Sequence, residues 1–381
     1  MTIPPDLETP LLLLDEERLR RNIARMQARM TELNVSFRPH AKTSKCPEVV
    51  RRQLAAGAAG ITVSTLKEAE RFQDAGVEDI LYAVAIAPAK LDHALRLQRR
   101  GLRLTQVVDS VAAAAALTRH GEVHGHCHAA LIEIDTDGHR SGLRPDDPAV
   151  LAVARALRAR AGAGARLRGV MTHAGASYSL STPEDLAAMA ERERAGCVAA
   201  AQRLRDAAHD CETVSIGSTP TALSARSLEG VTEVRAGVYV FFDLVMAGIG
   251  VCTREEIALS VLCSVIGHRS DARRVFTDAG WMAMSRDRGT ESQAQDFGYG
   301  LTCDVEGRPI AGLAFKEANQ EHGILEWHGE PGIDLTERFP IGSQLRILPN
   351  HACATGAQHE SYRVIPASGG DLLRWERFGG W

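Results

Sequence analysis

Between about residues 35 and 242, short β-prone apolar runs alternate with Ala-, Arg- and Glu-rich stretches in which apolar residues recur at helical spacing. This alternation is typical of repeated βα units. The predicted strands are VSFRP (35–39), GITVST (60–65), DILYAVA (79–85), LTQVVDS (104–110), AALIEID (129–135), LRGVMTH (167–173), TVSIGS (213–218) and VRAGVYVFF (234–242).

Helical stretches between these runs, such as EVVRRQLAAG and AKLDHALRLQRRG, end with glycine, where a helix stop is expected. Eight strands with crossover helices predict an α/β fold of the TIM-type (β/α)8 class. An open doubly wound sheet is the alternative fold. It is less favoured because no GxGxxG motif opens the first helix.

After about residue 255 the pattern changes to short alternating strands separated by Gly, Pro and Asn turns, as in ALSVLCSVIG and SQLRILPN. This pattern predicts a C-terminal antiparallel β domain. We expect residues 13–250 to form the barrel, and residues 1–12 with 251–381 to form the β domain. The strand-like segment TPLLLLDEE near the N-terminus could join either domain.

Composition and charge narrow the possible partners. The formal net charge of -4 and the pI near 6.4 provide no basic field for nucleic acid or an anionic membrane. A small-molecule substrate is therefore favoured. The N-terminus lacks the basic start and apolar run of a signal peptide, and no stretch approaches the ~20 apolar residues of a membrane span, so we expect a cytoplasmic protein.

The segment FRPHAKTSKC (37–46) follows the first predicted strand and places Lys42 where a barrel opens at its C-terminal mouth. A lysine there can act as a Schiff-base nucleophile, because partial desolvation favours the neutral amine. The alternative is that Lys42 and Lys45 are solvated loop charges.

The segment SIGSTPT (215–221) follows the seventh predicted strand and contains Gly217, Ser218 and Thr219. Its backbone N–H groups and hydroxyls could bind a phosphate, and barrels commonly place phosphate after strands seven and eight. An ordinary loop is the alternative, since turns of this composition are common.

The segment PNHACAT (349–355) suggests a metal site. If HAC is extended, alternation puts His351 and Cys353 on one face, as ligands for a borderline metal such as Zn²⁺. Two protein ligands leave an open shell, which suits Lewis-acid catalysis. The alternative is a surface histidine beside a buried cysteine.

Other polar residues follow predicted strands. Arg140 comes after the fifth strand and could pair with an anionic cofactor or form a surface ion pair. His173 and Tyr178 come at the end of the sixth strand. The His173 imidazole could contact a cofactor ring, and the Tyr178 phenol could hold phosphate or substrate. A hydrogen-bonded core histidine is an equally consistent interpretation of His173. Tyr239 lies in the eighth predicted strand, where a core aromatic is the alternative.

Several motifs occur in one order: RPHAKT, TDGHRSG, HAG, GSTPT, RAGVYVFFD, DAG, EHG and PNHACAT. From residue 8 to the end they resemble the D-threonine aldolase and D-serine dehydratase family. The resemblance implies a fold-type III pyridoxal phosphate enzyme with an alanine-racemase-like barrel, a β domain and a homodimeric assembly.

The same resemblance implies roles for the candidate residues. Lys42 would carry the cofactor, Arg140 would lie near its phenolic oxygen and His173 beside its pyridine ring. Its phosphate would be held by Gly217, Ser218, Thr219 and Tyr239. One position departs from the family pattern, since Met171 stands where the family often has tyrosine, and no partner is predicted for the ring nitrogen.

Family members that resemble the aldolases carry His-x-Asp at the metal site, whereas those that resemble the dehydratases carry His-x-Cys. The pair His351 and Cys353 therefore favours dehydration, a carbon-nitrogen lyase reaction. We expect D-threo-3-hydroxyaspartate to give oxaloacetate and ammonia, with D-serine as the next substrate and Zn²⁺, Mn²⁺, Co²⁺ or Mg²⁺ as the metal.

Two alternative functions are open. An aldolase would release glycine and an aldehyde instead of ammonia and a keto acid. A non-enzymatic pyridoxal phosphate carrier would release neither, and the second domain and the HxC pair argue against it.

Overall fold

A computed structural model describes residues 3–4 and 6–381. The chain divides into two compact units. We call Ile23–Gly237 with the last two residues the barrel unit, and the segment ending at Asn22 with Val238–Gly379 the β unit. From the sequence we predicted a cofactor-binding domain over residues 13–250 and a metal-binding domain over residues 1–12 and 251–381. That division stays a prediction. Within the described residues, no helix combines the length and the apolar character needed to cross a membrane.

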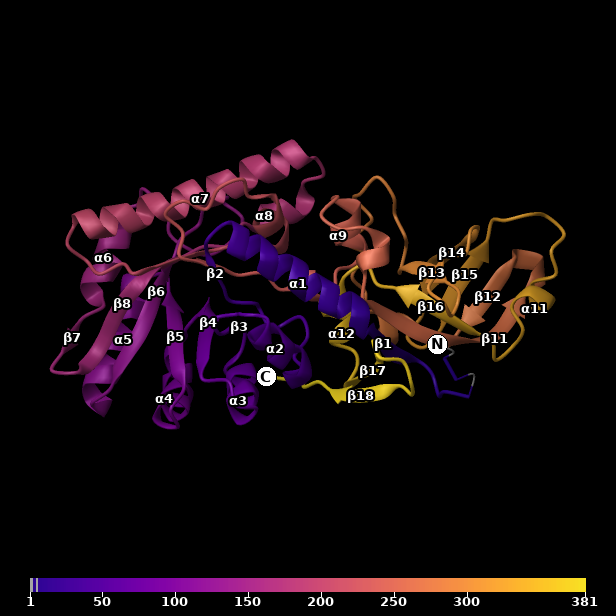
Figure 1. The fold of residues 1–381 in the computed structure, drawn as a ribbon, viewed down its shortest axis with the longest axis horizontal. Helices are drawn as coiled ribbons and strands as arrows, with labels where there is room; N and C mark the ends of the chain where they lie inside the picture. Colours follow the sequence, from indigo (N-terminus) through magenta and orange to yellow (C-terminus); the bar gives the residue numbers. More distant parts are fainter. Residues whose placement is uncertain (1–2, 5) are drawn as a thin grey trace. The chain divides into compact units, whose positions relative to one another are not determined.

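The barrel unit alternates strands and helices along the chain (Figure 1). Its strands are β2 (Ser36–Phe37), β3 (Ile61–Val63), β4 (Asp79–Ala85), β5 (Arg103–Val108), β6 (Cys127–Glu133), β7 (Ala159–Arg160), β8 (Ala163–Met171), β9 (Thr213–Ile216) and β10 (Glu233–Val234). Its helices are α2 (Pro47–Ala55), α3 (Leu66–Asp74), η1 (Pro88–Lys90), α4 (Leu91–Arg99), α5 (Val111–His124), α6 (Ala149–Ala156), η2 (Gly175–Ser179), α7 (Pro183–Asp206) and α8 (Thr219–Ser224). Helix α1 (Glu16–Glu32) begins in the β unit and ends in the barrel unit.

Within residues 23–237, all of them described, eight parallel strands follow the order β2-β10-β9-β8-β6-β5-β4-β3. A parallel bridge between His40 and Thr62 joins the two ends of this order. The Thr62 amide donates to Pro39 O at 2.8 Å, and the Ala41 amide donates to Thr62 O at 2.8 Å. The strands therefore close on themselves, and the predicted alanine-racemase-like barrel is confirmed.

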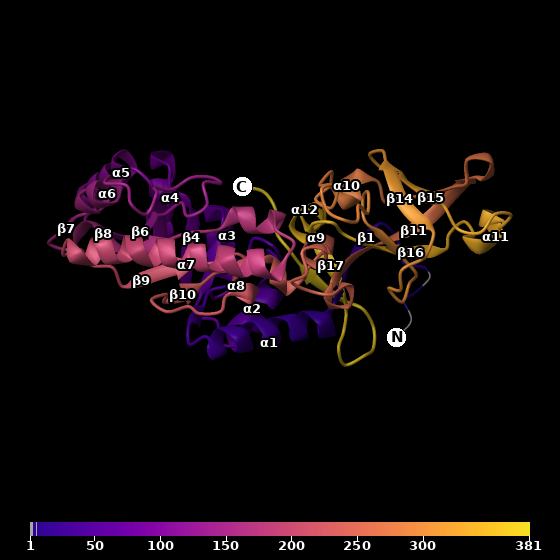
Figure 2. The same cartoon turned by 90° about the horizontal axis from the view of Figure 1, so that it is seen from above.

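Helices surround the strands on the outside of the barrel (Figure 2). Several begin at hydroxyl caps: the Thr65 side chain accepts from the Glu68 amide, and the Ser110 side chain accepts from the Ala113 amide. Inside the barrel, Met171 packs in a buried cluster with Leu81, Val107 and Leu131. The methionine that departs from the family pattern therefore fills apolar core.

One predicted strand is shorter than expected. The run 234–242 contains β10 only at its start, and Tyr239 lies in the 3-10 turn η3 (Val238–Val240) of the β unit. The Phe241 amide donates to Val238 O at 3.1 Å, so the chain turns on itself there. The prediction that Tyr239 lies in a strand is wrong, although its side chain is buried.

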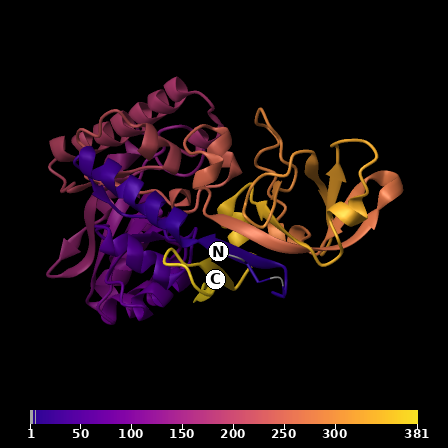
Figure 3. The same ribbon diagram turned by 45° about the vertical axis from the view of Figure 1, so that its right-hand side comes forward.

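The β unit is built on one long strand, β11, drawn in orange in Figure 3. Its strands are β1 (Leu11–Asp15), β11 (Leu259–Arg269), β12 (Arg274–Thr277), β13 (Leu301–Cys303), β14 (Leu313–Ala318), β15 (Gly323–Trp327), β16 (Gln344–Leu348), β17 (Ser361–Ile365) and β18 (Leu373–Glu376). Its helices are η3, α9 (Leu244–Gly248), η4 (Arg254–Glu256), η5 (Ser270–Ala272), α10 (Trp281–Met284), α11 (Leu335–Arg338) and α12 (Ala352–Gly356).

The strands of the β unit form the order β14-β15-β12-β11-β1-β17-β18, with β16 pairing both β11 and β13. The pairing is antiparallel except between β1 and β17, which are parallel. The N-terminal segment thus joins this sheet. The predicted antiparallel domain is confirmed, while β17 and β18 were not among the predicted strands.

Gly169 provides a test of the barrel packing. It pairs with Thr213 in β9 and has φ +151°, and a Cβ there would lie 1.9 Å from Thr213 O. Gly101 also has positive φ, +95°, but an added Cβ would meet no atom within 4 Å. We expect Gly169→Ala to lower the free energy of unfolding by ~1–3 kcal/mol more than Gly101→Ala, as measured by chemical denaturation. Equal losses would show that β8 and β9 are less tightly packed than described.

Candidate functional site

The candidate residues of the barrel unit follow the carboxyl ends of parallel strands. Lys42 follows β2, Arg140 follows β6, His173 follows β8 and Gly217 follows β9. Carboxyl ends of parallel barrel strands meet at one mouth, where active sites of this architecture lie. The structure therefore gathers these residues at one edge of the barrel.

The backbone around Lys42 is fixed by the closure of the barrel. The His40 amide donates to Ala236 O at 2.8 Å, and the Lys42 amide donates to Nδ1 of His40 at 3.4 Å. Ala41, Thr43 and their neighbour Ser44 are buried, whereas Lys42 is exposed. A rigid turn thus presents one lysine at the mouth.

The mouth carries a positive field. Burial, followed by the charges of Arg140, Lys42 and Arg235, lowers the pKa of His173 to about 3, against a raising effect from the Gly217 carbonyl. Burial and the same three cations, with His173, also lower the pKa of His40 well below its ordinary value. Both imidazoles are therefore neutral. Three cations around neutral rings fit an anionic ligand such as a phosphate ester.

His173 is oriented by the loop after the neighbouring strand. Its Nδ1 lies 2.9 Å from Gly217 O and donates to it, since a carbonyl oxygen can only accept. Its ring centroid lies 6.1 Å from that of Tyr178, with the planes tilted by 38°. The structure thus brings His173, Tyr178 and Gly217 together, while their roles stay a prediction.

The Gly217–Thr219 loop holds its shape through its own hydrogen bonds. Gly217 has φ +125°, and a Cβ there would lie 2.4 Å from Arg235 O, so glycine is required. Ser218 caps α8: its Oγ accepts from the Thr221 amide at 3.2 Å, while its own amide donates to Thr221 Oγ1 at 3.0 Å. The phosphate role of Gly217, Ser218 and Thr219 stays a prediction, because these amides of Ser218 and Thr221 already have partners in the loop.

Glu193 of α7 was not predicted from the sequence. It is fully buried, and its Oε1 accepts from the Ala174 amide at 2.8 Å and from the Gly217 amide at 3.1 Å. Burial raises the pKa of its carboxyl, which these two donors oppose. One carboxylate oxygen therefore ties the loop after β8 to the loop after β9. A glutamate inside a helical pattern carries no sequence signal for this task.

A second group that sequence reasoning missed is a buried polar chain inside the barrel. Arg235 donates to Ser215 Oγ and to Thr172 O, each at 2.5 Å, and Ser215 Oγ donates to Glu233 Oε1 at 2.6 Å. Glu233 also pairs with Arg38 at 2.6 Å. The chain of bonds joins the strand ends that carry the mouth residues.

Arg140 lies in a turn organised by an aspartate. Asp135 Oδ1 accepts from the Asp137 amide at 3.2 Å and from the Gly138 amide at 2.8 Å. Arg140 itself is exposed. Burial raises the pKa of the nearby Glu133 carboxyl, and the charge of Arg140 opposes this shift. The loop thus supplies an exposed guanidinium next to a buried acid.

In the β unit, the extended form of HAC that the sequence argument considered is not the one found. His351 has extended backbone (φ -136°), but Ala352–Gly356 form helix α12. The Ala352 amide donates to Oδ2 of the buried Asp243 at 2.9 Å, and the Thr355 amide donates to His351 O at 3.1 Å, which starts a helix. Strand alternation therefore does not place His351 beside Cys353.

His351 and Cys353 nevertheless lie close together, since a side-chain hydrogen bond joins them. His351 Nδ1 also lies 2.6 Å from Asp287 Oδ2, a partner that the sequence did not indicate. Burial alone would lower the pKa of His351, but Cys353, Asp287 and Asp243 outweigh it and raise the pKa to about 11. A thiol and an imidazole joined by a hydrogen bond, with carboxylates beside them, are a donor set that fits a divalent metal.

Comparisons with known proteins agree with this geometry. Residues 14–245 match the family model "Alanine racemase, N-terminal domain", and residues 258–365 match "Putative serine dehydratase domain". The fold and mouth thus define an alanine-racemase-like barrel with a dehydratase-type second domain. The chain belongs to the D-threonine aldolase and D-serine dehydratase family of fold-type III pyridoxal phosphate enzymes.

Three relatives illustrate the range of the family. The chain is 59% identical to D-threo-3-hydroxyaspartate dehydratase of Delftia sp. over 98% of each chain. It is 29% identical to D-serine dehydratase of Dictyostelium discoideum over 94% of each chain, and 30% identical to D-threonine aldolase of Arthrobacter sp. over 94% of this chain and 89% of the relative.

Solved structures of the Delftia dehydratase match the fold closely. The enzyme superposes with a TM-score of 0.96 at 59% identity, covering 99% of each chain. Its C353A variant in the metal-free form gives a TM-score of 0.95 at 58% identity, also covering 99% of each chain.

The neutral state of His173 predicts a pH dependence of stability. The pKa of histidine is about 6.5 in an unfolded chain, whereas that of His173 is about 3. Between these values the unfolded chain binds a proton that the folded chain does not. The free energy of unfolding should therefore fall as pH falls from about 6.5 towards 3, by up to ~1.4 kcal/mol per pH unit from this residue.

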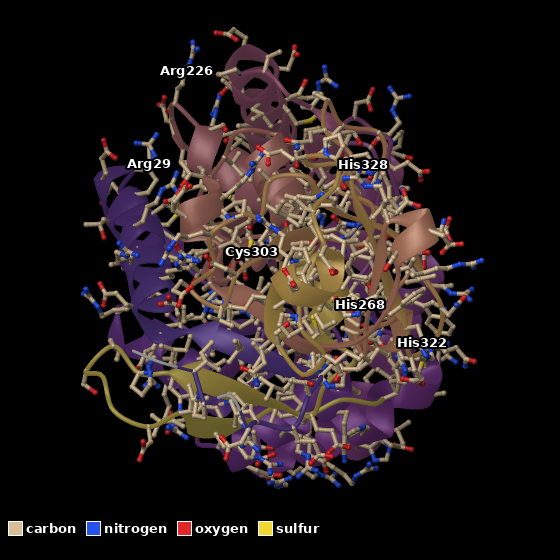
Figure 4. All side chains as sticks on the ribbon, turned by 90° about the vertical axis from the view of Figure 1, so that its right-hand side faces the viewer. Arg29, Arg226, His268, Cys303, His322 and His328 are labelled. Carbon is tan, nitrogen blue, oxygen red and sulfur yellow. The ribbon has the colours of Figure 1, made fainter. Side chains whose placement is uncertain are left out.

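Denaturation between pH 6.5 and 4.5 tests this expectation. The variant His173→Asn should show a shallower loss of stability than the wild type, while His322→Asn, which replaces an exposed histidine of the β unit (Figure 4), should keep the wild-type slope. An unchanged slope in His173→Asn would mean that His173 is not held neutral by the fold.

Proposed function

We propose that the chain is a dehydratase of D-3-hydroxy amino acids that depends on pyridoxal phosphate and a divalent metal, and that it converts D-threo-3-hydroxyaspartate to oxaloacetate and ammonia. The reaction class is that of a carbon-nitrogen lyase, with D-serine as a neighbouring substrate. The observation that carries the proposal is the 59% identity to D-threo-3-hydroxyaspartate dehydratase over 98% of both chains.

Residues of the barrel mouth would hold the cofactor. Lys42 would bind it covalently through its amine, with Arg140 near the phenolic oxygen and neutral His173 beside the ring. Tyr178 and Tyr239, with the Gly217–Thr219 loop, would contact the phosphate or substrate. Support comes from the positive field that the cations of the mouth impose on both buried histidines. Bound pyridoxal phosphate supplies a conjugated ring that withdraws electrons from the substrate amine and α-carbon.

Lys42 would have a second task. The Lys42 amine, when it is not bound to the cofactor, would be the base that removes the α-proton of the substrate. The turn fixed by His40 and Thr62 would keep the backbone of Lys42 in place for both tasks. Burial and the neighbouring cations keep His173 neutral, while its bond to Gly217 O orients the ring, so it adds no further positive charge to the ring contact.

His351 and Cys353 would hold the metal, and Asp287 would orient His351 by accepting from Nδ1, which leaves Nε2 for the ion. Support comes from the Delftia relative, in which a variant lacking a cysteine with the same number is in a metal-free form. A metal there supplies Lewis-acid stabilisation of the departing 3-hydroxyl. The 3-carboxylate of hydroxyaspartate could join the shell as a chelate that serine cannot form.

Three further expectations belong to this proposal, the first from the family resemblance and the other two from the sequence and the ligand chemistry. The protein would form a homodimer, it would work in the cytoplasm, and its metal would be Zn²⁺, Mn²⁺, Co²⁺ or Mg²⁺. Zn²⁺ suits imidazole and thiolate ligands, whereas a shell completed by oxygen ligands accepts the others.

Product analysis with metal removal tests the proposal. D-threo-3-hydroxyaspartate, D-serine and D-threonine are each assayed for ammonia, keto acid and glycine, with and without EDTA. We expect chelator-sensitive ammonia and oxaloacetate. Cys353→Ala should reduce the rate by about 100-fold or more, because metal stabilisation of the leaving group amounts to several kcal/mol.

The matched control is Cys303→Ala, which removes a thiol from β13 of the same unit (Figure 4) and should keep wild-type metal dependence. Release of glycine and an aldehyde would show that the enzyme is an aldolase and not a dehydratase. Release of neither ammonia nor glycine from any of the three acids would favour a cofactor carrier.

A further inference from the structure

A cluster of histidines lies on the outside of the barrel unit, at the end of α5 and the start of β6, in the sequence HGEVHGHCH (120–128). His120 and His124 are one turn apart on α5, so their side chains share a face. Their ring centroids lie 4.4 Å apart. Asp92, in the first turn of the neighbouring helix α4 (Figure 1), completes the group.

Three donor atoms of this group converge. Asp92 Oδ1 lies 3.0 Å from His120 Nε2 and 3.8 Å from His124 Nε2. One donor atom from each residue falls within 4.8 Å of the others. Ligands of a tetrahedral zinc ion with ~2.0–2.1 Å bonds lie ~3.3 Å apart, so only small side-chain movements separate this arrangement from a coordination shell.

A buried histidine behind the cluster determines which nitrogen of His120 carries the hydrogen. His128 Nε2 lies 3.0 Å from His120 Nδ1, and His128 Nδ1 lies 2.9 Å from Gln98 Oε1. His128 is fully buried, and the partners of its two ring nitrogens are two amides and an imidazole, with no carboxylate among them, so its ring is neutral and carries one N–H.

The two glutamines beside His128 decide its tautomer. Gln98 Nε2 donates to Leu104 O at 3.2 Å, which fixes the amide so that its oxygen faces His128. Gln106 Nε2 lies 3.1 Å from the same His128 Nδ1, but Gln106 Oε1 has no hydrogen-bond partner among the described residues. A hydrogen on His128 Nδ1 donates to Gln98 Oε1 and requires only that the Gln106 amide turn its oxygen to the same nitrogen, whereas the other tautomer would require Gln98 to rotate and lose its bond to Leu104. The hydrogen of His128 therefore sits on Nδ1.

The tautomer of His120 follows. Because His128 Nε2 has no hydrogen, it accepts from His120 Nδ1, and the Nε2 lone pair of His120 then faces the Asp92 carboxylate at 3.0 Å. A lone pair that faces a carboxylate at this distance is satisfied either by a second proton on His120 or by a metal ion between the two groups. Metal-ligating histidines commonly donate their other N–H to a second-layer acceptor, and His128 Nε2 is an acceptor in that position.

We propose that Asp92, His120 and His124 form a second divalent-metal site, for zinc or a related first-row ion, that links α4 to α5 on the outside of the barrel. Two imidazoles and a carboxylate are a ligand set that zinc prefers, with water completing the shell. Asp92 is 75% exposed and His124 37% exposed, so the ion can enter from solvent. The site belongs to the barrel unit, whereas His351 and Cys353 belong to the β unit, and the proposal does not depend on the activity.

The test counts zinc in the full-length holoenzyme. Protein stripped with EDTA is equilibrated with zinc, freed of excess metal by gel filtration, and analysed for zinc per chain. His124→Asn is compared with His322→Asn, an exposed histidine of the β unit (Figure 4), so that any metal at His351 and Cys353 contributes equally to both. We expect His124→Asn to hold one zinc fewer per chain.

Asp92→Asn provides a second ligand variant at an exposed position, with little risk to folding, and it should lose the same equivalent. Zinc should also raise the melting temperature of His322→Asn more than that of either ligand variant. Equal zinc content in His124→Asn, Asp92→Asn and His322→Asn would overturn the second site.

Discussion

The barrel mouth depends on one buried cation, the guanidinium of Arg235. It donates to Ser215 Oγ in β9 and to Thr172 O after β8, while its own residue follows β10. It therefore joins three consecutive strand ends. A buried arginine of this kind is tolerated because it donates to two oxygen acceptors and interacts with nearby acids, including Glu233 and Glu193. With Lys42 and Arg140, the same charge helps to keep His40 and His173 neutral, so Arg235 contributes to both the shape and the field of the mouth.

Much of the fold could be predicted from the sequence, because hydrophobic periodicity reports which face of each element is buried. The strands of the barrel and most of the second sheet follow from this pattern. The segment 234–242 was predicted wrongly as one strand, because its apolar residues suit a strand. HAC forms a helix that depends on a distant residue: Asp243 accepts from the Ala352 amide across more than a hundred positions. The residues next to a segment in the sequence do not reveal a hydrogen-bond partner so far away along the chain.

The candidate site divides in the same way. Lys42, Arg140, His173 and Gly217 stand beside strand ends and could be predicted from their place in the repeat and from the resemblance. Glu193, Arg235 and Asp287 could not, since a charged residue within a helix or loop usually faces solvent. These three orient the groups that the sequence did reveal: Glu193 holds two loops, Arg235 holds three strand ends, and Asp287 holds His351. A chemically active side chain is recognisable by type, whereas its supporting partner is recognisable only in three dimensions.

The most direct measurement is the location of the cofactor on the chain. Reduction of the holoenzyme with borohydride fixes pyridoxal phosphate to the amine that carries it, and peptide mass mapping then identifies that residue. The phosphopyridoxyl mass should appear on Lys42, with loss of tryptic cleavage at that position, and Lys45 should remain unmodified. Labelling of Lys45 or another lysine, or no stoichiometric label at all, would contradict the assignment of the barrel mouth as the cofactor site.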